Sequence, residues 1–313
     1  MQAQYNEKKG GQVIMINRQV LNVLPLKIRE VIERELTLVK KEKASCDIQV
    51  EEIRIRVGKQ VLLITGKEEI RLDVTVNEMM IREAMEYISG YSLYAYEEQL
   101  REGFITIRGG HRVGIAGKVV MEQGRVKTIK NISSINIRIS HQIIGCSDEI
   151  MKYLNGNILI VSPPRMGKTT LLRDILRNLG NTKNQTIAIV DERSEIAACY
   201  NGIPQNDIGE RCDVLDCCPK DTGMLMLLRT MSPTYIAVDE LASQADVESV
   251  LKITGAGANI AATIHGGSIQ EVMRRKSICE LFDREIFDTY IELSCICIKI
   301  CNKSMEKIYE GKR

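Results

Sequence analysis

The sequence predicts an α/β protein with a mostly parallel sheet in its second half, preceded by a smaller α+β domain. From about residue 146 onward, short apolar runs alternate with amphipathic segments, which is typical of a parallel sheet with crossover helices. In the first half, hairpin-like pairs of alternating segments stand between helical ones. We therefore expect two domains, an N-terminal α+β domain over residues 1–145 and a second domain over residues 146–313.

The composition is that of a globular protein with room for about two cores. The chain has 313 residues, of which 44% are hydrophobic and 27% charged, and its formal net charge is +2. Such a small charge creates no overall field that demands nucleic acid or a membrane surface. The polar start Met1–Lys9 lacks the apolar segment of a secretory signal, and no run approaches the ~18 apolar residues of a membrane span. We expect a cytoplasmic protein that reaches a membrane only peripherally, through a partner.

The ten cysteines predict a reducing compartment, because nothing else in the sequence indicates secretion. No C-x-x-C pair is present, so a zinc site is not expected. Cys295, Cys297 and Cys301 alternate with isoleucines, which favours small buried residues on one face of a strand.

In the first domain, apolar residues at helical spacing over Val20–Lys43 predict one or two helices. Ile48–Val57 alternates as a strand does, and Val61–Thr65 follows as its hairpin partner. Helices are also expected over Asn77–Ser89 and Ala95–Arg101. The remaining strands expected here are Phe104–Ile107, Arg112–Val120, Val126–Lys130 and Ser134–Ile139.

Several arginines lie on these expected strands, namely Arg54, Arg56, Arg108, Arg112 and Arg138. They fit a solvated sheet face, or a basic surface turned towards a phosphate or a neighbouring subunit. For each arginine taken separately, the solvated face is the simpler interpretation.

The second domain is expected to contain four parallel strands joined by helices. The strands are Ile158–Val161, Thr186–Val190, Tyr235–Val238 and Asn259–Ile264, and the helices are Thr169–Leu179, Gly223–Met231 and Gln244–Gly255. A polar segment, Ser194–Lys220, separates the second strand from the second helix. Ligands of such sheets bind beyond the carboxyl ends of the strands, so polar residues that follow these strands are the candidate site.

The first strand runs into a phosphate-binding pattern, which is the strongest functional signal in the chain. Its residues are Ser162, Pro163, Pro164, Arg165, Met166, Gly167, Lys168, Thr169 and Thr170, and a helix begins there. Backbone N–H groups and the helix dipole would hold phosphate oxygens, Lys168 would reach the β- and γ-phosphates, and Thr169 would ligate Mg²⁺. Ser162 replaces the first glycine of the G-x-x-x-x-G-K-[ST] pattern, so we expect an altered loop geometry. A strand-to-helix turn without a ligand is the alternative.

Two acids follow the strand Tyr235–Val238 directly. Asp239 would hold Mg²⁺, mainly through its water shell, and Glu240 would orient and deprotonate an attacking water. Apolar runs that end in two acids are common, but this one follows the phosphate-binding pattern at the right distance. The glutamate favours hydrolysis of a nucleotide over binding alone.

Other strand ends carry further candidates. His265 could sense a γ-phosphate, although a lone histidine is more often structural. Asp191, Glu192 and Glu195 could hold a metal ion or a water, or could cap the following segment. Arg229 is either a cation at a helix C-terminus or a phosphate contact between subunits.

With these residues placed, the chain resembles the secretion-type ATPases, the hexameric motors of type II and type IV secretion and of pilus assembly. The matching boxes are Ser162–Thr169 (Walker A), Ile189–Glu195 (Asp box), Tyr235–Glu240 (Walker B), Ala262–His265 (His box) and Leu228–Pro233 (arginine segment). Within this group the chain is most similar to ATPases of sporulation. That similarity is carried by Glu52–Gly58, Gly110–Gly114, Val190–Ile196 and Met231–Pro233.

The resemblance implies a RecA-like motor domain that uses ATP and Mg²⁺ within a homo-oligomer, a hexamer, with nucleotide between subunits. It implies that Arg138 is an arginine finger for the neighbouring subunit's site, which would make hydrolysis depend on assembly. It also implies an integral membrane partner and a role in powering a secretion complex between mother cell and forespore. The tetracysteine zinc module of many type II motors is absent from this sequence.

Two other functions remain open at this stage. A nucleotide-binding scaffold that orders a membrane complex without turnover is favoured by Ser162 and opposed by Glu240. A nucleic-acid translocase gains a little from the basic strands of the first domain. The small net charge opposes it, so nucleic acid is not the expected partner.

Overall fold

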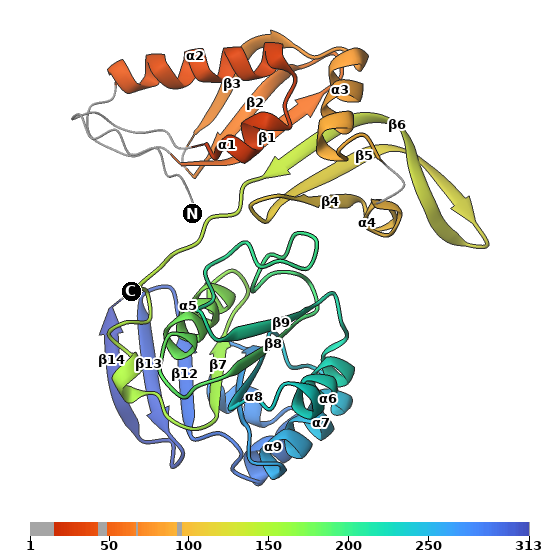
Figure 1. Cartoon of the computed structure of the whole chain (residues 1–313). Helices are drawn as coiled ribbons and strands as arrows, with labels where there is room; N and C mark the ends of the chain where they lie inside the picture. The colour runs from red at the N-terminus through yellow and green to blue at the C-terminus, as the bar shows by residue number, and fades with distance from the viewer. Residues whose placement is uncertain (1–15, 43–48, 67, 93–95, 313) are drawn as a thin grey trace. The chain divides into compact units, whose positions relative to one another are not determined.

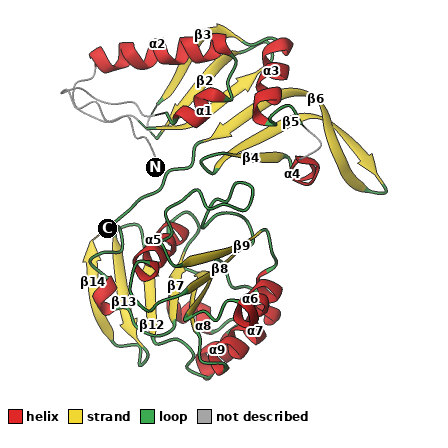
Figure 2. Cartoon of the chain, in the orientation of Figure 1, coloured by secondary structure: helices red, strands yellow, loops and turns green. Residues whose placement is uncertain are grey.

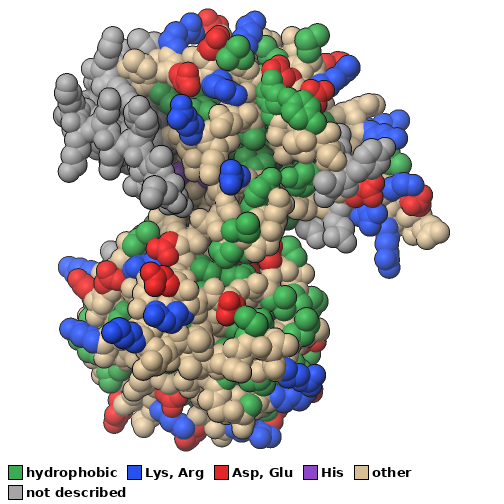
Figure 3. All heavy atoms as spheres, viewed as in Figure 1, with side chains coloured by type: hydrophobic (Ala, Val, Ile, Leu, Met, Phe, Trp, Pro, Cys, Tyr) green, Lys and Arg blue, Asp and Glu red, His purple; other side chains and the backbone are tan. Residues whose placement is uncertain are grey.

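The structure is a computed structural model that describes residues 16–42, 49–66, 68–92 and 96–312. The chain divides into two compact units, Met1–His141 and Gln142–Arg313 (Figure 1). This division falls a few residues before the expected domain boundary. Compact packing alone does not define an independently folding domain, so the boundary at residue 145 stays a prediction. On the face of the molecule that Figure 3 shows, acidic and basic side chains are interspersed over most of the surface, in keeping with a net charge of +2.

The first unit is built on a six-stranded antiparallel sheet in the order β3-β2-β1-β6-β5-β4. Its elements are α1 (Arg18–Asn22), α2 (Leu26–Glu42), β1 (Val50–Arg56), β2 (Gln60–Thr65), β3 (Glu69–Thr75), α3 (Glu78–Ile88), α4 (Glu97–Glu102), β4 (Phe104–Ile107), β5 (His111–Glu122) and β6 (Arg125–Arg138). Ile28 and Ile32 of α2 pack in one core with Ile53 and Ile55 of β1. The alternating residues of β1 therefore place one face of the sheet under the helices.

Most expected elements of the first unit are confirmed, with two differences. Strand β3 was not expected, although its polar and apolar residues alternate and its apolar side includes the buried Leu72 and Val74. The expected strands Val126–Lys130 and Ser134–Ile139 form the single strand β6, which continues through Asn131 at a φ of 46°. The expected element ends Lys43, Ile48 and Ala95, and the polar start Met1–Lys9, lie outside the described residues.

Local partners account for two of the arginines on this sheet. Arg54 pairs with Glu52 at 2.7 Å, and the guanidinium of Arg112 lies over the ring of Phe104. For these two residues the structure favours the solvated sheet face over a phosphate-binding surface.

The second unit contains an eight-stranded sheet in the order β14-β13-β12-β7-β11-β10-β8-β9. Its elements are β7 (Ile158–Ser162), α5 (Lys168–Gly180), β8 (Ile187–Asp191), β9 (Cys212–Asp216), α6 (Lys220–Thr230), β10 (Tyr235–Val238), α7 (Gln244–Gly255), β11 (Asn259–His265), α8 (Ile269–Met273), α9 (Cys279–Asp283), β12 (Thr289–Leu293), β13 (Cys297–Asn302) and β14 (Lys307–Lys312), with a 3₁₀ turn at Met151–Tyr153. The six strands from β12 to β9 are parallel, whereas β13 and β14 run antiparallel.

Helices cover both faces of this sheet (Figure 2). Ile158 and Ile160 of β7 pack in the core that contains α5, whereas Leu159 and Val161 pack in the core that contains α6 and α7. This two-sided burial explains why the parallel strands read as continuous apolar runs. Because these strands are parallel, their polar carboxyl ends lie at the same edge of the sheet.

Several elements of the second unit escaped the sequence analysis. Strand β9 lies inside the expected polar segment Ser194–Lys220, because it is an edge strand with only partly buried residues. The expected row of buried cysteines is wrong for Cys295, which is exposed in the turn before β13, and right for the buried Cys301. In the part of the chain that the structure describes, no group of three or more His, Cys, Asp or Glu residues is placed to hold a metal ion. Among the same residues, no helix is both long and apolar enough to cross a membrane.

Candidate functional site

The backbone of the loop between β7 and α5 adopts the left-handed conformation at two residues, Arg165 and Gly167. Their φ angles are 63° and 74°, and the second suits glycine. Ser162 ends β7, where it is buried and its carbonyl accepts a hydrogen bond from the N–H of Gly266 at 3.0 Å. Ser162 is not among the described residues with positive φ. Ser162 therefore continues the strand in a conformation that does not require glycine, and the expected change in loop geometry stays a prediction.

Helix α5 begins at the two residues that were expected to contact phosphate and metal. The Thr169 hydroxyl donates to Oδ2 of Asp239 at 2.7 Å, and Nζ of Lys168 lies 3.8 Å from Oδ1 of the same carboxylate. Lys168 is only 8% exposed, so its charge is held close to the start of the helix. A helix N-terminus with a buried lysine attracts anions. Pro163, Pro164, Met166 and Thr170 belong to the same loop and first helical turn, next to these residues in the chain.

Asp239 is held between two elements at the carboxyl edge of the sheet. Besides Thr169, the buried Thr263 of β11 donates its hydroxyl to Asp239. Thr263 was missed by the sequence analysis, although a hydroxyl in an otherwise apolar strand could have pointed to it. Hydroxyl and carboxylate oxygens are the ligands that Mg²⁺ prefers, with waters and phosphate oxygens completing its shell. Asp239 and Thr169 therefore fit a magnesium site.

Glu240 follows with a φ of 60°, which is unusual for a residue other than glycine. Its N–H donates to the Thr263 hydroxyl at 2.9 Å, so the same threonine positions both acids. The Glu240 carboxylate lies 3.4 Å from Nε2 of His265 and 3.4 Å from Nη1 of Arg193. Nδ1 of His265 is buried without a hydrogen-bond partner among the described residues. The expected pair of acids and the histidine thus meet in one place, together with Arg193.

Asp191 occupies the end of β8, next to Asp239 in the sheet, but its carboxylate is fully used by the backbone. It accepts the N–H groups of Glu195, Ile196 and Ala197 at 2.8–2.9 Å. Burial raises the pKa of Asp191, and the three hydrogen bonds oppose that rise. Of the two interpretations of Asp191, the structure matches capping of the following segment.

The neighbouring residues of Asp191 are also occupied. The Glu192 carboxylate pairs with the ammonium group of Lys220. The backbone carbonyls of Glu195 and Ile196 accept hydrogen bonds from the guanidinium of Arg173 at 2.6–2.7 Å. Arg173, which the sequence analysis missed, is buried in α5 and connects the phosphate-binding helix to the segment after β8. Burial lowers the pKa of Arg173, and the charges of nearby acids including Asp191 oppose that shift.

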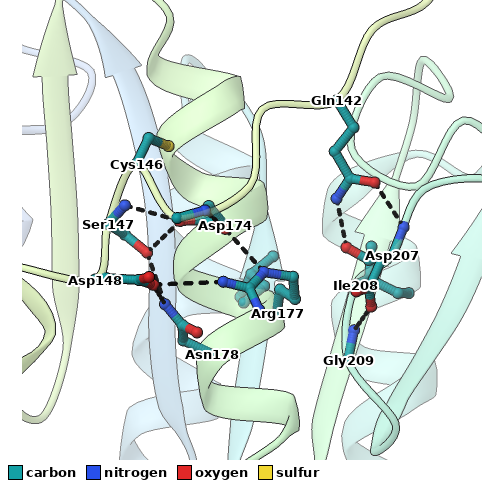
Figure 4. A network of polar contacts seen from close by, with 12 residues as sticks. Gln142, Cys146, Ser147, Asp148, Asp174, Arg177, Asn178, Asp207, Ile208 and Gly209 are labelled. Carbon is teal, nitrogen blue, oxygen red and sulfur yellow. Dashed lines mark hydrogen bonds and ion pairs between the residues drawn. The ribbon is translucent and has the colours of Figure 1, made fainter. Parts of the chain in front are cut away.

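A second buried aspartate, Asp174, connects α5 by hydrogen bonds to the segment that precedes β7 (Figure 4). The Asp174 carboxylate accepts the N–H groups of Gly145 and Ser147 at 3.0 and 2.7 Å, and the Ser147 hydroxyl at 2.7 Å. Nε of Arg177 donates to it at 2.8 Å. Burial opposes ionisation of Asp174, but these donors outweigh it and hold the pKa below its ordinary value. Helix α5 is therefore fixed at a point two turns from Lys168.

Two expected site residues lie elsewhere. Arg229 is exposed in the last turn of α6, and the chain after it passes beside the start of β8, where Thr234 donates to the carbonyl of Thr186 at 2.8 Å. That is the amino edge of the sheet, opposite to Asp239. Arg138 ends β6 in the first unit, with a 67% exposed side chain whose Nε lies 3.9 Å from the Glu52 carboxylate. Within one chain, Arg229 is not brought to the site, and the roles of both arginines stay predictions.

Comparison with known proteins places this chain among sporulation proteins. A family described as "Sporulation stage III, protein AA" matches residues 15–309. The stage III sporulation protein AA of Bacillus subtilis (strain 168) is 42% identical over 255 residues, which span 79% of this chain and 83% of that protein.

Solved structures show the same fold. The ATPase DotB of Legionella pneumophila is similar with a TM-score of 0.57 and 16% identity, over 92% of this chain and 80% of that one. The pilus retraction motor PilT with bound ADP is similar with a TM-score of 0.58 and 15% identity, over 91% and 82% of the two chains. The predicted RecA-like α/β fold with a smaller N-terminal sheet and the predicted resemblance to secretion ATPases are confirmed.

Proposed function

This chain belongs to the family of Sporulation stage III, protein AA, and from that premise we propose that it is an ATP-hydrolysing motor of a secretion complex that acts in sporulation. The observation that supports hydrolysis most directly is the cluster at the carboxyl edge of the second sheet. There, Thr169 and Asp239 are joined by a 2.7 Å hydrogen bond, and Glu240 stands beside His265. Binding alone would not require a second acid placed next to the metal-binding pair.

Each residue of the cluster has a role in this mechanism. The loop N–H groups and Lys168 hold the phosphates of ATP, and Thr169 and Asp239 hold Mg²⁺, which would offset charge on the β- and γ-phosphate oxygens. Glu240 accepts a proton from the attacking water while it orients that water. Nε2 of His265, 3.4 Å from Glu240, donates to a γ-phosphate oxygen.

The contacts of Glu240 also suggest how the site rests before reaction. Its carboxylate is shared between His265 and Arg193, at 3.4 Å from each. These distances are long for hydrogen bonds, so both contacts are weak and can be exchanged for contacts to nucleotide and water.

Assembly completes the proposal. We propose a ring of six chains with nucleotide between subunits, in which Arg138 and Arg229 reach the site of a neighbouring copy. Both are exposed, as a residue that acts on another subunit must be in the free chain. An arginine that acts in this way can raise turnover by ~10³–10⁵. An integral membrane protein would receive the motion, and the chain would stay peripheral to the membrane.

The test is steady-state ATP hydrolysis as a function of protein concentration, with wild type beside Glu240→Gln. We expect turnover that rises faster than linearly with concentration, and a kcat roughly 10²–10³ lower in the variant with ATP binding retained. The exposed Glu210→Gln is the matched control, because it removes one charge of the same unit away from the cluster. Tight ATP binding without any turnover that depends on Glu240, at high concentration and with membrane partners present, would identify a non-hydrolysing scaffold instead.

A further inference from the structure

The hairpin of β5 and β6 continues well beyond the sheet of the first unit. Strand β4 pairs with β5 only over His111–Gly114, and β1 pairs with β6 only over Ser134–Arg138. Between these limits, the two strands pair with each other and with no further strand in the described part of the chain. Figure 1 shows this ribbon projecting from the unit, and we call residues 117–132 the arm.

The arm bends away from the sheet at a β-bulge. The ladder between β5 and β6 shifts register at Ala116–Lys118, and the facing Asn131 has a φ of 46°. A Cβ on Gly117 would lie 2.7 Å from the carbonyl oxygen of Lys130, so only glycine fits there. A bulge of this kind bends a hairpin in a fixed direction. The sequence therefore specifies the arm as a feature of the fold.

Positive charge is concentrated on the arm. It carries four basic residues, Lys118, Arg125, Lys127 and Lys130, and one acid, Glu122, so its net charge of +3 exceeds the +2 of the whole chain. Lys118 and Lys130 are direct cross-strand partners, an arrangement that destabilises a free hairpin. Within the described residues, Lys127 pairs with Glu122 at 2.6 Å, and no ion pair involves Lys118, Arg125 or Lys130. In Figure 3 basic side chains gather over this projection.

The opposite face of the arm is apolar. Val119 faces Ile129 and Met121 faces Val126 across the ladder, so these four side chains share one face while Lys118 and Lys130 share the other. Ile129 packs in part on the core of the unit. Val119 and Met121 remain 46% and 57% exposed. The arm is thus a basic, amphipathic ribbon with aliphatic side chains turned to solvent.

We propose that the arm lies on the anionic surface of a lipid bilayer. Val119 and Met121 would enter the boundary between headgroups and acyl chains, and the long side chains of Lys118 and Lys130, on the other face, would reach back around the ribbon to lipid phosphates. A nucleic acid would neutralise the basic residues but would make no use of the apolar ones, and the arm has no aromatic residue on which a base could stack. A single arm binds weakly, and several copies in one assembly would bind together more tightly. The contact is direct, in addition to any membrane partner, and does not depend on ATP hydrolysis.

The experiment measures co-sedimentation of the full chain with phosphatidylcholine vesicles, with and without phosphatidylglycerol. We expect binding only to the anionic vesicles, weakened by salt, and a partition coefficient roughly tenfold or more lower in Lys118→Gln/Lys130→Gln. Val119→Ser/Met121→Ser should weaken binding at high salt, where the apolar contribution remains. The control is Lys59→Gln/Lys183→Gln, which removes two exposed lysines outside the arm.

Three outcomes would overturn the proposal. One is wild type that does not bind anionic vesicles; another is binding that Lys118→Gln/Lys130→Gln leaves unchanged. The third is binding of a DNA or RNA duplex, but not of vesicles, with the same dependence on the two lysines. Thermal unfolding and ATP hydrolysis in solution, measured on the same samples, separate loss of the arm contact from misfolding. Absence of hydrolysis in wild type would count against the motor and leave the arm proposal intact.

Discussion

The second sheet carries the triplet Val-Asp-Glu twice, at the ends of two neighbouring parallel strands. Val190–Glu192 ends β8 and Val238–Glu240 ends β10, and the two valines are register partners. Both aspartates therefore start from the same edge of the same sheet. Their partners nevertheless differ completely.

The difference arises from the chain that follows each triplet. After β8 the backbone folds back over Asp191 and gives it three N–H donors from residues 195–197. After β10 the partners of Asp239 are side chains instead, namely Thr169, Lys168 and the buried Thr263. The first aspartate stabilises a loop, whereas we infer that the second is available to a metal ion and nucleotide. Position at a strand end is thus necessary for the site but does not define it.

Of the two triplet aspartates, Asp239 should show the larger effect on activity, in the variant Asp239→Asn. We expect kcat to fall by about a hundredfold or more and the dependence on Mg²⁺ concentration to weaken, because the variant loses the only carboxylate of the expected metal pair. The free energy of unfolding without nucleotide should change by less than about 1 kcal/mol, since the amide oxygen can still accept from Thr169. Mg²⁺ titration of ATP hydrolysis and urea unfolding measure the two effects. The exposed Asp213→Asn is the control, and equal losses of activity in both variants would contradict the assignment.

Asp174 differs from Asp191 in its pKa. Both aspartates are buried, but the hydrogen-bond donors around Asp174 favour its charged form. Its pKa lies below the ordinary value of 3.8, so its contribution to stability is complete above pH 3.8 and is lost as pH falls through the lowered pKa. Asp174→Asn should therefore lower the free energy of unfolding at pH 7 by roughly 2–3 kcal/mol and flatten the acid limb of the stability curve. Urea unfolding at several pH values tests this. Parallel curves for wild type and variant would show that Asp174 does not titrate in this way.

Asp191→Asn is expected to cost less, about 1–2 kcal/mol of unfolding free energy. One amide hydrogen would face the N–H of Glu195, but the variant also removes a buried charge whose pKa burial raises. The kcat of the folded fraction should stay near that of wild type. Parallel urea unfolding and hydrolysis assays on Asp191→Asn and Asp239→Asn would then show opposite patterns. A loss of activity at Asp191 without loss of stability would place it in the chemistry after all.

The sequence was sufficient for four strands of the parallel core and for the residues at their carboxyl ends, but not for β12, a buried parallel strand beside β7 that was not expected. Apolar runs buried on both faces are unambiguous, so β7, β8, β10 and β11 were predicted within a residue or two. Two edge strands were also missed: β9 lies in a polar segment and has no fully buried residue, whereas β3 was overlooked despite its alternating residues. The role of Arg193 was out of reach, because it depends on a contact with Glu240 far away in the chain, whereas the Thr263 hydroxyl in an apolar strand was a signal that could have been used.

The smallest effect is expected from Glu192→Gln, the counterpart of Glu240→Gln in the first triplet. Glu192 is paired with Lys220 at the surface, and such pairs contribute about 0.2–1 kcal/mol to stability. We expect kcat within about threefold of wild type and a small loss of stability that high salt removes, because screening already weakens the pair. Hydrolysis and unfolding at low and high salt provide the measurement. If Glu192→Gln abolished turnover as Glu240→Gln is expected to do, Glu192 would take part in the reaction. Its ion pair with Lys220 in the single chain would then not indicate its role.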